Sequence, residues 1–159
     1  MDTNITFRPI TLQDEGFLYR LYASTREDEL AQVPWSASEK ESFLRMQFAL
    51  QHKYYLETFS SASFLVIELG ERPIGRLYLD RREDRFHMID VALLPEYRGG
   101  GIGTLLLQAF LGEAGAHNLP VTCYVEKYNR AQTLYKRLGF ITIEDTEVHL
   151  LMEWKSGEK

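Results

Sequence analysis

Apolar residues follow two different spacings along this chain, and segments of the two kinds alternate. Short apolar runs rich in β-branched and aromatic residues have the length and composition of β-strands. Longer stretches, in which apolar residues recur every three or four positions, have the period of amphipathic helices. The pattern predicts strands at seven places: Ile5 to Ile10, Phe64 to Leu69, Ile74 to Asp80, Phe86 to Leu94, Val121 to Val125, Phe140 to Ile143 and Val148 to Trp154.

The predicted helices begin at residues that commonly cap helices. Thr11 opens the first helix, and the segment Ser38 to Glu41 fits a capping box that opens the second. A third helix follows a glycine-rich segment, and Asn129 opens a fourth that runs through Leu138, with Gly139 just after its end. The second helix is expected to carry four apolar residues on one face: Phe43, Met46, Leu50 and Tyr54.

The order of these elements is typical of one fold class. It reads β-α-α-β-β-β-α-β-α-β-β, which predicts an α/β protein with a mixed sheet and helices packed on its faces. A chain of 159 residues fits one domain, since domains run to roughly 100–200 residues. We therefore expect a single domain over residues 1–155 and a frayed tail over residues 156–159.

Composition and charge exclude several classes of function. The net charge of −5 disfavours general nucleic-acid binding, which needs a basic face. Cys123 is the single cysteine, so an internal disulfide and a cysteine-based metal cluster are ruled out, and no metal is expected. The first residues lack the features of a signal peptide, and no apolar run approaches the roughly 18 residues of a membrane helix. We expect a cytoplasmic protein.

The strongest local signal is the glycine-rich segment from Arg98 to Gly103, which has four glycines in positions 99 to 103 and joins a strand to a helix. Glycines let the backbone approach a ligand, and the free N–H groups of a helix start attract phosphate. A plain turn would need only one glycine. Thr104 follows Gly103 where a Walker loop requires lysine, and the dinucleotide pattern G-x-G-x-x-G also fails.

Two blocks of sequence around this segment carry a family resemblance. Arg98-x-x-Gly101-x-Gly103 resembles the pyrophosphate loop of the GCN5-related N-acetyltransferases, the GNAT superfamily. The preceding run from Val91 to Tyr97 is similar to the family strand that ends in a proline. The block from Asn129 to Phe140 is similar to the family's N-x-x-A-x-x-L-Y-x-x-x-G-F motif, with its alanine one place early. Together these matches cover residues 86 to 143.

The resemblance implies a GNAT-like fold with a splayed central pair of strands, and acetyl-CoA as the co-substrate. It places the pyrophosphate on the loop amides and the pantetheine arm on strand backbone around Val91 and Leu93. Residues of the loop and its flanks are thus expected to bind the cofactor: Arg98, Gly99, Gly100, Gly101, Ile102, Gly103, Thr104 and Asn129. Packing explains the apolar strand residues equally well, and capping alone explains Asn129.

The reaction that the resemblance implies is direct transfer of an acetyl group to a primary amine. Tyr135 lies at the family's tyrosine position and is expected to protonate the leaving thiolate, since a phenol with a pKa near 10 can donate to it. For the base, the resemblance points to His87, whose imidazole titrates in a useful range. The alternatives are an exposed strand histidine without a role, a water chain, or three other side chains: Asp90, Tyr124 and Glu126.

The residues that bind the acceptor are harder to identify from the sequence. The resemblance implies that the first two helices and their connection line the acceptor site. Glu27, Asp28 and Glu29 could attract a cationic amine and Trp35 could stack on it, although a solvated loop with Trp35 over the core explains them too. We expect a small-molecule amine as partner. A non-catalytic acyl-CoA-binding module, a protein or peptide N-acetyltransferase, and a homodimer stay open.

Overall fold

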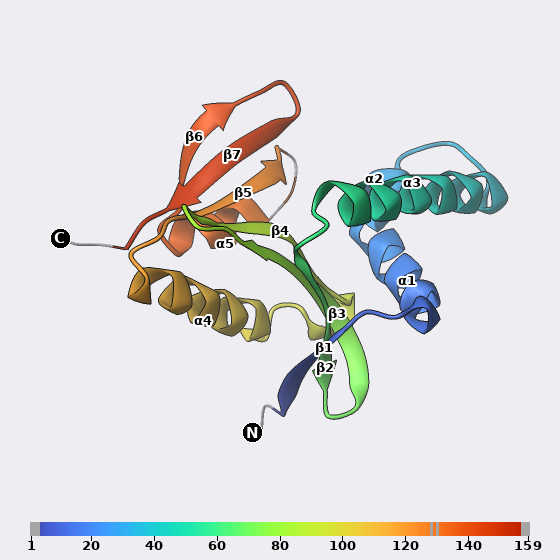
Figure 1. The fold of residues 1–159 in the computed structure, drawn as a ribbon. Coiled ribbons are helices and arrows are strands. Elements are labelled where there is room, and N and C mark those ends of the chain that lie inside the picture. Colours follow the sequence, from blue (N-terminus) through green and yellow to red (C-terminus); the bar gives the residue numbers. More distant parts are fainter. Residues whose placement is uncertain (1–3, 128, 130, 157–159) are drawn as a thin grey trace. The chain divides into compact units, whose positions relative to one another are not determined.

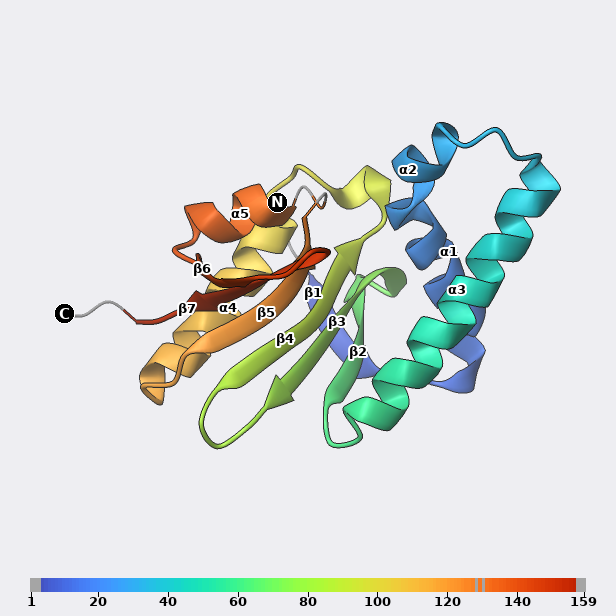
Figure 2. The same ribbon diagram turned by 90° about the horizontal axis from the view of Figure 1, so that it is seen from above.

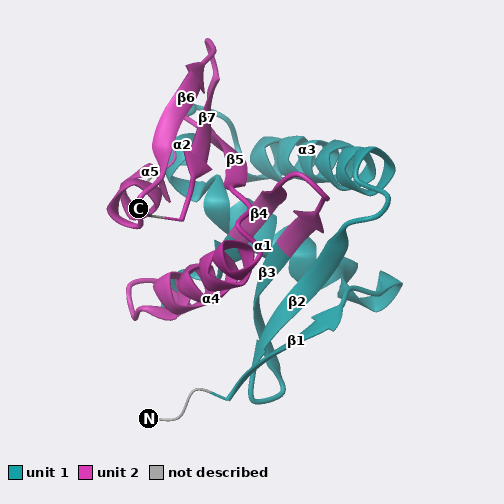
Figure 3. Cartoon of the chain, turned by 60° about the vertical axis from the view of Figure 1, so that its left-hand side comes forward, with its two compact units in different colours: residues 1–77, 92–96 teal, residues 78–91, 97–159 magenta. Residues whose placement is uncertain are grey.

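The computed structural model describes residues 4–127, 129 and 131–156, which fall into two compact units (Figure 3). The first unit comprises residues up to Leu77 together with Ala92–Glu96, and the second comprises Tyr78–Val91 and the residues from Tyr97 onward. Two strands contribute residues to both units. Residues 157–159, most of the tail that we expected to fray, lie outside the described residues.

Apart from one short additional helix, α2 (Glu27–Ala31), the elements follow the predicted order (Figure 1). The strands are β1 (Ile5–Pro9), β2 (Ser63–Leu69), β3 (Arg72–Arg81), β4 (Phe86–Leu93), β5 (Val121–Glu126), β6 (Ile141–Asp145) and β7 (His149–Trp154). The helices are α1 (Glu15–Thr25), α2 (Glu27–Ala31), α3 (Ala37–Thr58), α4 (Ile102–Ala116) and α5 (Ala131–Arg137). The strands form a seven-stranded sheet in the order β1-β2-β3-β4-β5-β7-β6. The predicted α/β fold with a mixed sheet is confirmed.

In the first unit, the start of the chain is fixed by one charged cluster. β1 pairs antiparallel with β2, and Arg8 on β1 contacts Asp14 at 2.8 Å and Glu68 at 2.9 Å. Thr11 and Asp14 form a reciprocal capping box, as the sequence indicated for Thr11. α1 then buries its apolar face, in which Phe17, Leu18, Leu21 and Tyr22 pack against α3. The Arg8 guanidinium lowers the pKa of Asp14 to about 2 through its hydrogen bonds.

Two details of the α3 prediction were wrong. Ser36 caps the helix, with Glu39 as the reciprocal partner, so the capping box lies two residues before the predicted position. Phe48 is the residue that α3 buries. The stripe of Met46, Leu50 and Tyr54 is exposed. The apolar pattern of α3 did not identify its buried side, because each of its sides carries large apolar residues.

The segment between α1 and α3 also differs from the prediction. Residues 27–31 form the short helix α2, where the sequence suggested an irregular connection. Three acids occupy its first turn, where carboxylates interact favourably with the helix dipole. Its one buried side chain is Leu30. The acidic run is therefore a helix start.

In the second unit, the strands form one sheet whose two faces differ in character. β4 and β5 pair in parallel, and β7 pairs antiparallel with both β5 and β6. α4 and α5 lie together along these strands (Figures 1 and 2). Phe86 of β4 stacks on Phe110 of α4 at 5.4 Å. Registered partners in a parallel pair share a face. Met88 and Cys123, two positions beyond Phe86 and its partner, therefore face the helices, whereas His87 and Thr122 face the other way.

α4 is rotated slightly from the orientation that its sequence suggested. The buried residues are Leu106, Leu107, Phe110, Leu111 and Ala114. The sequence has apolar residues at helical spacing at positions 102, 105, 106, 109 and 110, which predicts Leu105 on the buried face, but Leu105 is 51% exposed. Within the described residues, no helix combines the length and the apolar content that a membrane crossing would require. Among those same residues, no group of three or more histidine, cysteine or acidic side chains is placed to hold a metal ion.

Candidate active site

The glycine segment forms a tight turn that ends directly on α4. Gly99 and Gly101 have φ values of 79° and 90°, a region that disfavours residues with a side chain. A Cβ atom added at Gly99, Gly100 or Gly101 would meet nothing within 4 Å, so the backbone here faces open space. The sequence thus places glycine where the chain must bend, and leaves its peptide groups accessible.

The start of α4 has N–H groups that its own residues do not cap. Gly101 is the N-cap residue and has no side chain to accept their hydrogen bonds. The first turn, all of which the structure describes, carries no acidic residue. The N–H groups of Ile102, Gly103 and Thr104 lack partners inside the helix by geometry. Together with the exposed Arg98, they suit an anion such as a pyrophosphate.

Beside this turn, the parallel pairing of β4 with β5 ends early. It joins only Phe86 to Val121, His87 to Thr122 and Met88 to Cys123. β5 continues to Glu126 and stays paired with β7 along that length. Residues 89 to 91 of β4 and 124 to 126 of β5 are therefore not joined in this ladder. Backbone groups along such a divergence suit an extended ligand that adds itself as a strand.

The two strand residues expected on the pantetheine arm have different positions. Val91 is the last residue of β4 within the second unit, and it follows the end of the ladder. Leu93 belongs to the first unit, where the end of β4 is fixed closely against β3. The N–H of Leu94 donates to the carbonyl of Ile74 at 2.8 Å. A Cβ atom on Gly75 would lie 2.3 Å from the carbonyl oxygen of Ala92, which explains the glycine there.

Tyr135 is a buried residue on α5. Its ring packs against Phe140, with centroids 5.4 Å apart, and the side chain is 6% exposed. Burial raises its pKa above the ordinary value, and the nearby Cys123 and Asp90 groups act in the same direction. The hydroxyl is therefore protonated at neutral pH and can donate a hydrogen bond. Gly139 ends this helix with φ 107°, as the sequence predicted.

His87 is buried, so the alternative of an exposed strand histidine was wrong. Its Nδ1 lies 2.8 Å from the Thr122 hydroxyl. Burial lowers its pKa to about 4, with help from Arg82 and Arg85 and against the effect of Asp80. The imidazole is thus neutral at pH 7. His87 and Thr122 form the middle one of the three registered pairs in the β4–β5 ladder, one pair before the ladder ends.

Asn129 acts as a helix cap. Its side-chain oxygen accepts the N–H of Ala131 at 2.8 Å, at the start of α5. The capping role predicted from the sequence is confirmed. A contact with the cofactor stays a prediction.

The structure adds residues that the sequence did not single out. Thr122 shares a face with His87, and the ring of His149 on β7 lies 6.5 Å from that of Tyr124. These residues come from three strands that are far apart in sequence. The alternation along β5 shows which of its residues share a face, but the register with β4 and β7 is needed to bring in the two histidines.

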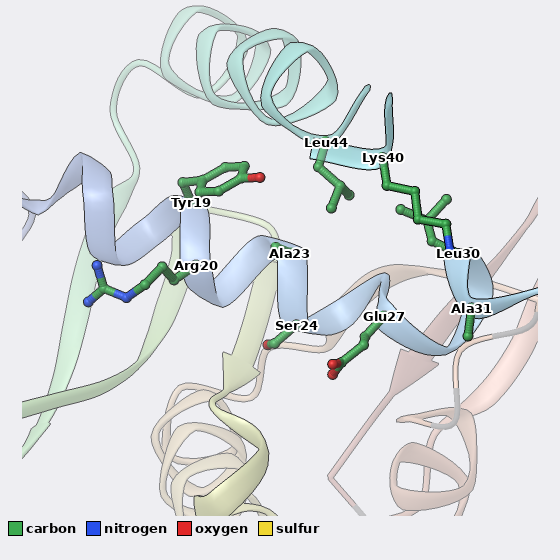
Figure 4. A pocket seen from close by; sticks show the side chains of 9 residues that line it. All are labelled: Tyr19, Arg20, Ala23, Ser24, Glu27, Leu30, Ala31, Lys40 and Leu44. Atoms are coloured by element: carbon green, nitrogen blue, oxygen red, sulfur yellow. The ribbon is translucent and has the colours of Figure 1, made fainter. Parts of the chain in front are cut away.

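The first unit contains a cavity of about 480 Å³ (Figure 4). Its lining comes from α1, α2 and α3 and includes Glu27. Glu29 is engaged by Arg26 at 2.8 Å. Trp35 is 42% exposed and packs edge-on against Phe43 at 5.3 Å. Asp28 lies in the same first turn of α2. Of these four residues, Glu27 alone lines the cavity.

Comparison with known proteins agrees with this geometry. A family model described as an acetyltransferase (GNAT) domain matches residues 60–142, which is just over half of the chain. The chain belongs to the GNAT acetyltransferase family. The match includes the glycine turn, the diverging strands and Tyr135. The family resemblance found in the sequence is therefore confirmed.

Individual GNAT relatives are distant in sequence and close in fold. A mycothiol acetyltransferase of Streptomyces scabiei is 28% identical over 141 residues, covering 82% of this chain; the chain spans 44% of that protein's length. The PaiA N-acetyltransferase of Thermoplasma acidophilum, solved with coenzyme A, is 23% identical with a TM-score of 0.69, covering 98% of this chain and 99% of that one. A GNAT acetyltransferase of Elizabethkingia anophelis with bound acetyl-CoA is 16% identical with a TM-score of 0.62, and the match covers 97% of this chain and 99% of that one. These structures show the same fold.

Proposed function

We propose that this GNAT protein is an N-acetyltransferase that transfers an acetyl group from acetyl-CoA to a primary amine of a small molecule. The observation that carries the proposal is the early end of the β4–β5 ladder in the same unit as an uncapped, glycine-opened helix. The two features offer the two recognition modes that a coenzyme A thioester requires, one for an anion and one for an extended amide chain.

The described residues fit acetyl-CoA. Backbone N–H groups from Gly99 to Thr104 would hold the pyrophosphate, and Arg98 adds a positive charge beside them. Backbone of β4 up to Val91, and Leu93 at the end of the strand, would pair with the pantetheine amides. Asn129 would contribute a contact near the start of α5. When bound, the thioester supplies an activated carbonyl carbon to the incoming amine.

In the transfer, a C–N bond forms, the C–S bond breaks, and two protons must move. Tyr135 donates its hydroxyl proton, or a hydrogen bond, to the sulfur that carries the departing electron pair. Its raised pKa keeps the hydroxyl protonated at neutral pH, so that it is a hydrogen-bond donor to the sulfur. The hydroxyl is a better acid toward a thiolate produced next to it than bulk water is, because water has the higher pKa.

The amine attacks in its neutral form, and its nitrogen must lose one proton as the C–N bond forms. We propose that His87 accepts this proton, directly or through a water molecule. Its low pKa means that it is unprotonated at neutral pH and only a weak base. A water chain is the alternative route, and the pH profile of a His87→Ala variant distinguishes the two routes.

The decisive experiment uses the whole chain in two steps. Titration calorimetry with acetyl-CoA measures binding, and thiol release over a panel of primary amines measures turnover. We expect binding and turnover with at least one amine. Binding without turnover on any amine or peptide would favour a non-catalytic acyl-CoA module, whereas turnover on peptide N-termini alone would favour a protein acetyltransferase. No binding at millimolar concentration would overturn the proposal.

A further inference from the structure

Tyr124 is a large aromatic side chain placed on an open part of the sheet. It is 54% exposed, although most of β5 is buried. Its ring lies 5.8 Å from that of His87 on β4 and 6.5 Å from that of His149 on β7, at interplanar angles of 69° and 78°. Because β5 lies between β4 and β7, the two imidazoles flank the tyrosine. The phenol ring is thus fixed on two sides and still open to solvent.

An acidic group lies on the same face of the strand. Glu126 follows Tyr124 by two positions, so the two side chains project to the same side. It is exposed, and its registered partner on β7 is His149. The adjacent cation, Lys127, is engaged with Asp145 at 2.6 Å. The face therefore presents a π-surface and a carboxylate together, a combination that attracts an organic cation.

The position of this pair relates it to the acetyl-transfer site. The β4–β5 ladder ends at Met88 and Cys123, and Tyr124 is the next residue of β5. The thioester arm that we propose between the strands would thus end near Tyr124. An amine that attacks the thioester has lost its own positive charge by that point. A cation bound by Tyr124 and Glu126 must then be a second charged group of the acceptor.

We infer that Tyr124 and Glu126 bind a remote cationic group of the acceptor, so that the preferred acceptors are linear diamines with one amine reacting and the other held as an ammonium. The inference rests on the proposed function. Tyr124 and Glu126 act here as specificity-determining residues. His87 and His149 position the tyrosine ring.

The experiment compares three amines of similar length: diaminobutane, butylamine and aminobutyrate. They carry a remote ammonium, a methyl group and a carboxylate. The wild-type chain should show the highest kcat/KM for diaminobutane, chiefly through a lower KM. Tyr124→Leu should raise the KM for diaminobutane about tenfold and leave that for butylamine within about twofold. Tyr124→Phe should keep the preference, because the π-surface remains. Glu126→Gln should weaken the preference about threefold to fivefold.

Phe7→Leu is the matched control, since Phe7 is another exposed aromatic residue, on β1, and is 44% exposed. Acetyl-CoA binding to each variant, measured by calorimetry, shows that the fold is intact. Equal loss on all three amines, or an unchanged preference in Tyr124→Leu, would overturn the inference while leaving acetyl transfer itself established. If no variant and no wild-type protein turns over any amine, the proposed function fails instead.

Discussion

In the segment from Arg98 to Thr104, most of the groups proposed to face the ligand belong to the backbone, whereas on the open face of β5 they belong to side chains. The first region needs only glycines at two positive φ values and a helix start. The second needs three strands in a specific register to bring Tyr124 between two imidazoles. Backbone recognition can therefore be encoded in one short segment, whereas side-chain recognition depends on the assembled sheet. Four variants test the contrast.

The largest effect on the reaction rate is expected for Tyr135, the buried side chain that we propose as the proton donor. Tyr135→Phe keeps the ring that packs on Phe140 and removes the hydroxyl. We expect kcat to fall about a hundredfold or more, as for loss of a general acid, with KM for acetyl-CoA within about twofold. Steady-state kinetics measures both. An unchanged kcat would remove Tyr135 from the mechanism, and a lowered melting temperature would reveal a structural role.

A substitution in the turn should act on binding alone. Gly101→Val forces a β-branched residue into φ 90°, a strain of about 1–3 kcal/mol, and moves the first N–H groups of α4. We expect the Kd for acetyl-CoA to rise about thirtyfold to a hundredfold. Gly112→Ala is the control, because it adds a methyl group in open space elsewhere on α4. Similar Kd values for the two variants would contradict the backbone site.

The buried imidazole should make stability depend on pH. Because the pKa of His87 is lowered from 6.5 to about 4 in the folded state, the unfolded chain binds the proton more readily between those values. The contribution of His87 to the free energy of unfolding is therefore fully present above pH 6.5 and is lost as the pH falls toward 4. Between pH 7 and pH 4, the free energy of unfolding, measured with denaturant, should fall by about 2–3 kcal/mol more in the wild type than in His87→Asn. An equal fall in the free energy of unfolding in the two proteins would mean that His87 is hydrated in the folded state.

The smallest effect concerns a residue with two suggested roles. Asn129→Ala removes the hydrogen bond to the N–H of Ala131 and should cost about 1 kcal/mol of stability. Asn129→Ser restores a cap and should recover most of that loss by thermal melting. If acetyl-CoA affinity recovers with stability, capping explains Asn129 fully. If affinity stays low in the serine variant, the side chain contacts the cofactor.

The same contrast between local and assembled features separates the sequence predictions that succeeded from those that failed. The glycine segment, the cap at Asn129 and the glycine after α5 depend on neighbours a few residues away, and the structure bears out each as local geometry. The predicted box at Ser38 was displaced to Ser36, because two serines two residues apart offer equivalent caps. The exposed stripe on α3 and the rotation of α4 show that apolar period alone does not select a buried side when several sides are apolar.

By itself, the sequence determined the order of the elements other than α2, the turn that opens α4 and the family to which the chain belongs. These features depend on backbone conformation and on hydrophobic period, both of which are local. Tertiary structure decided that His87 is buried and neutral, that the β4–β5 ladder ends at Met88, and that Tyr124 lies between two histidines. Desolvation and strand register decide these features, and both arise only when distant segments pack together.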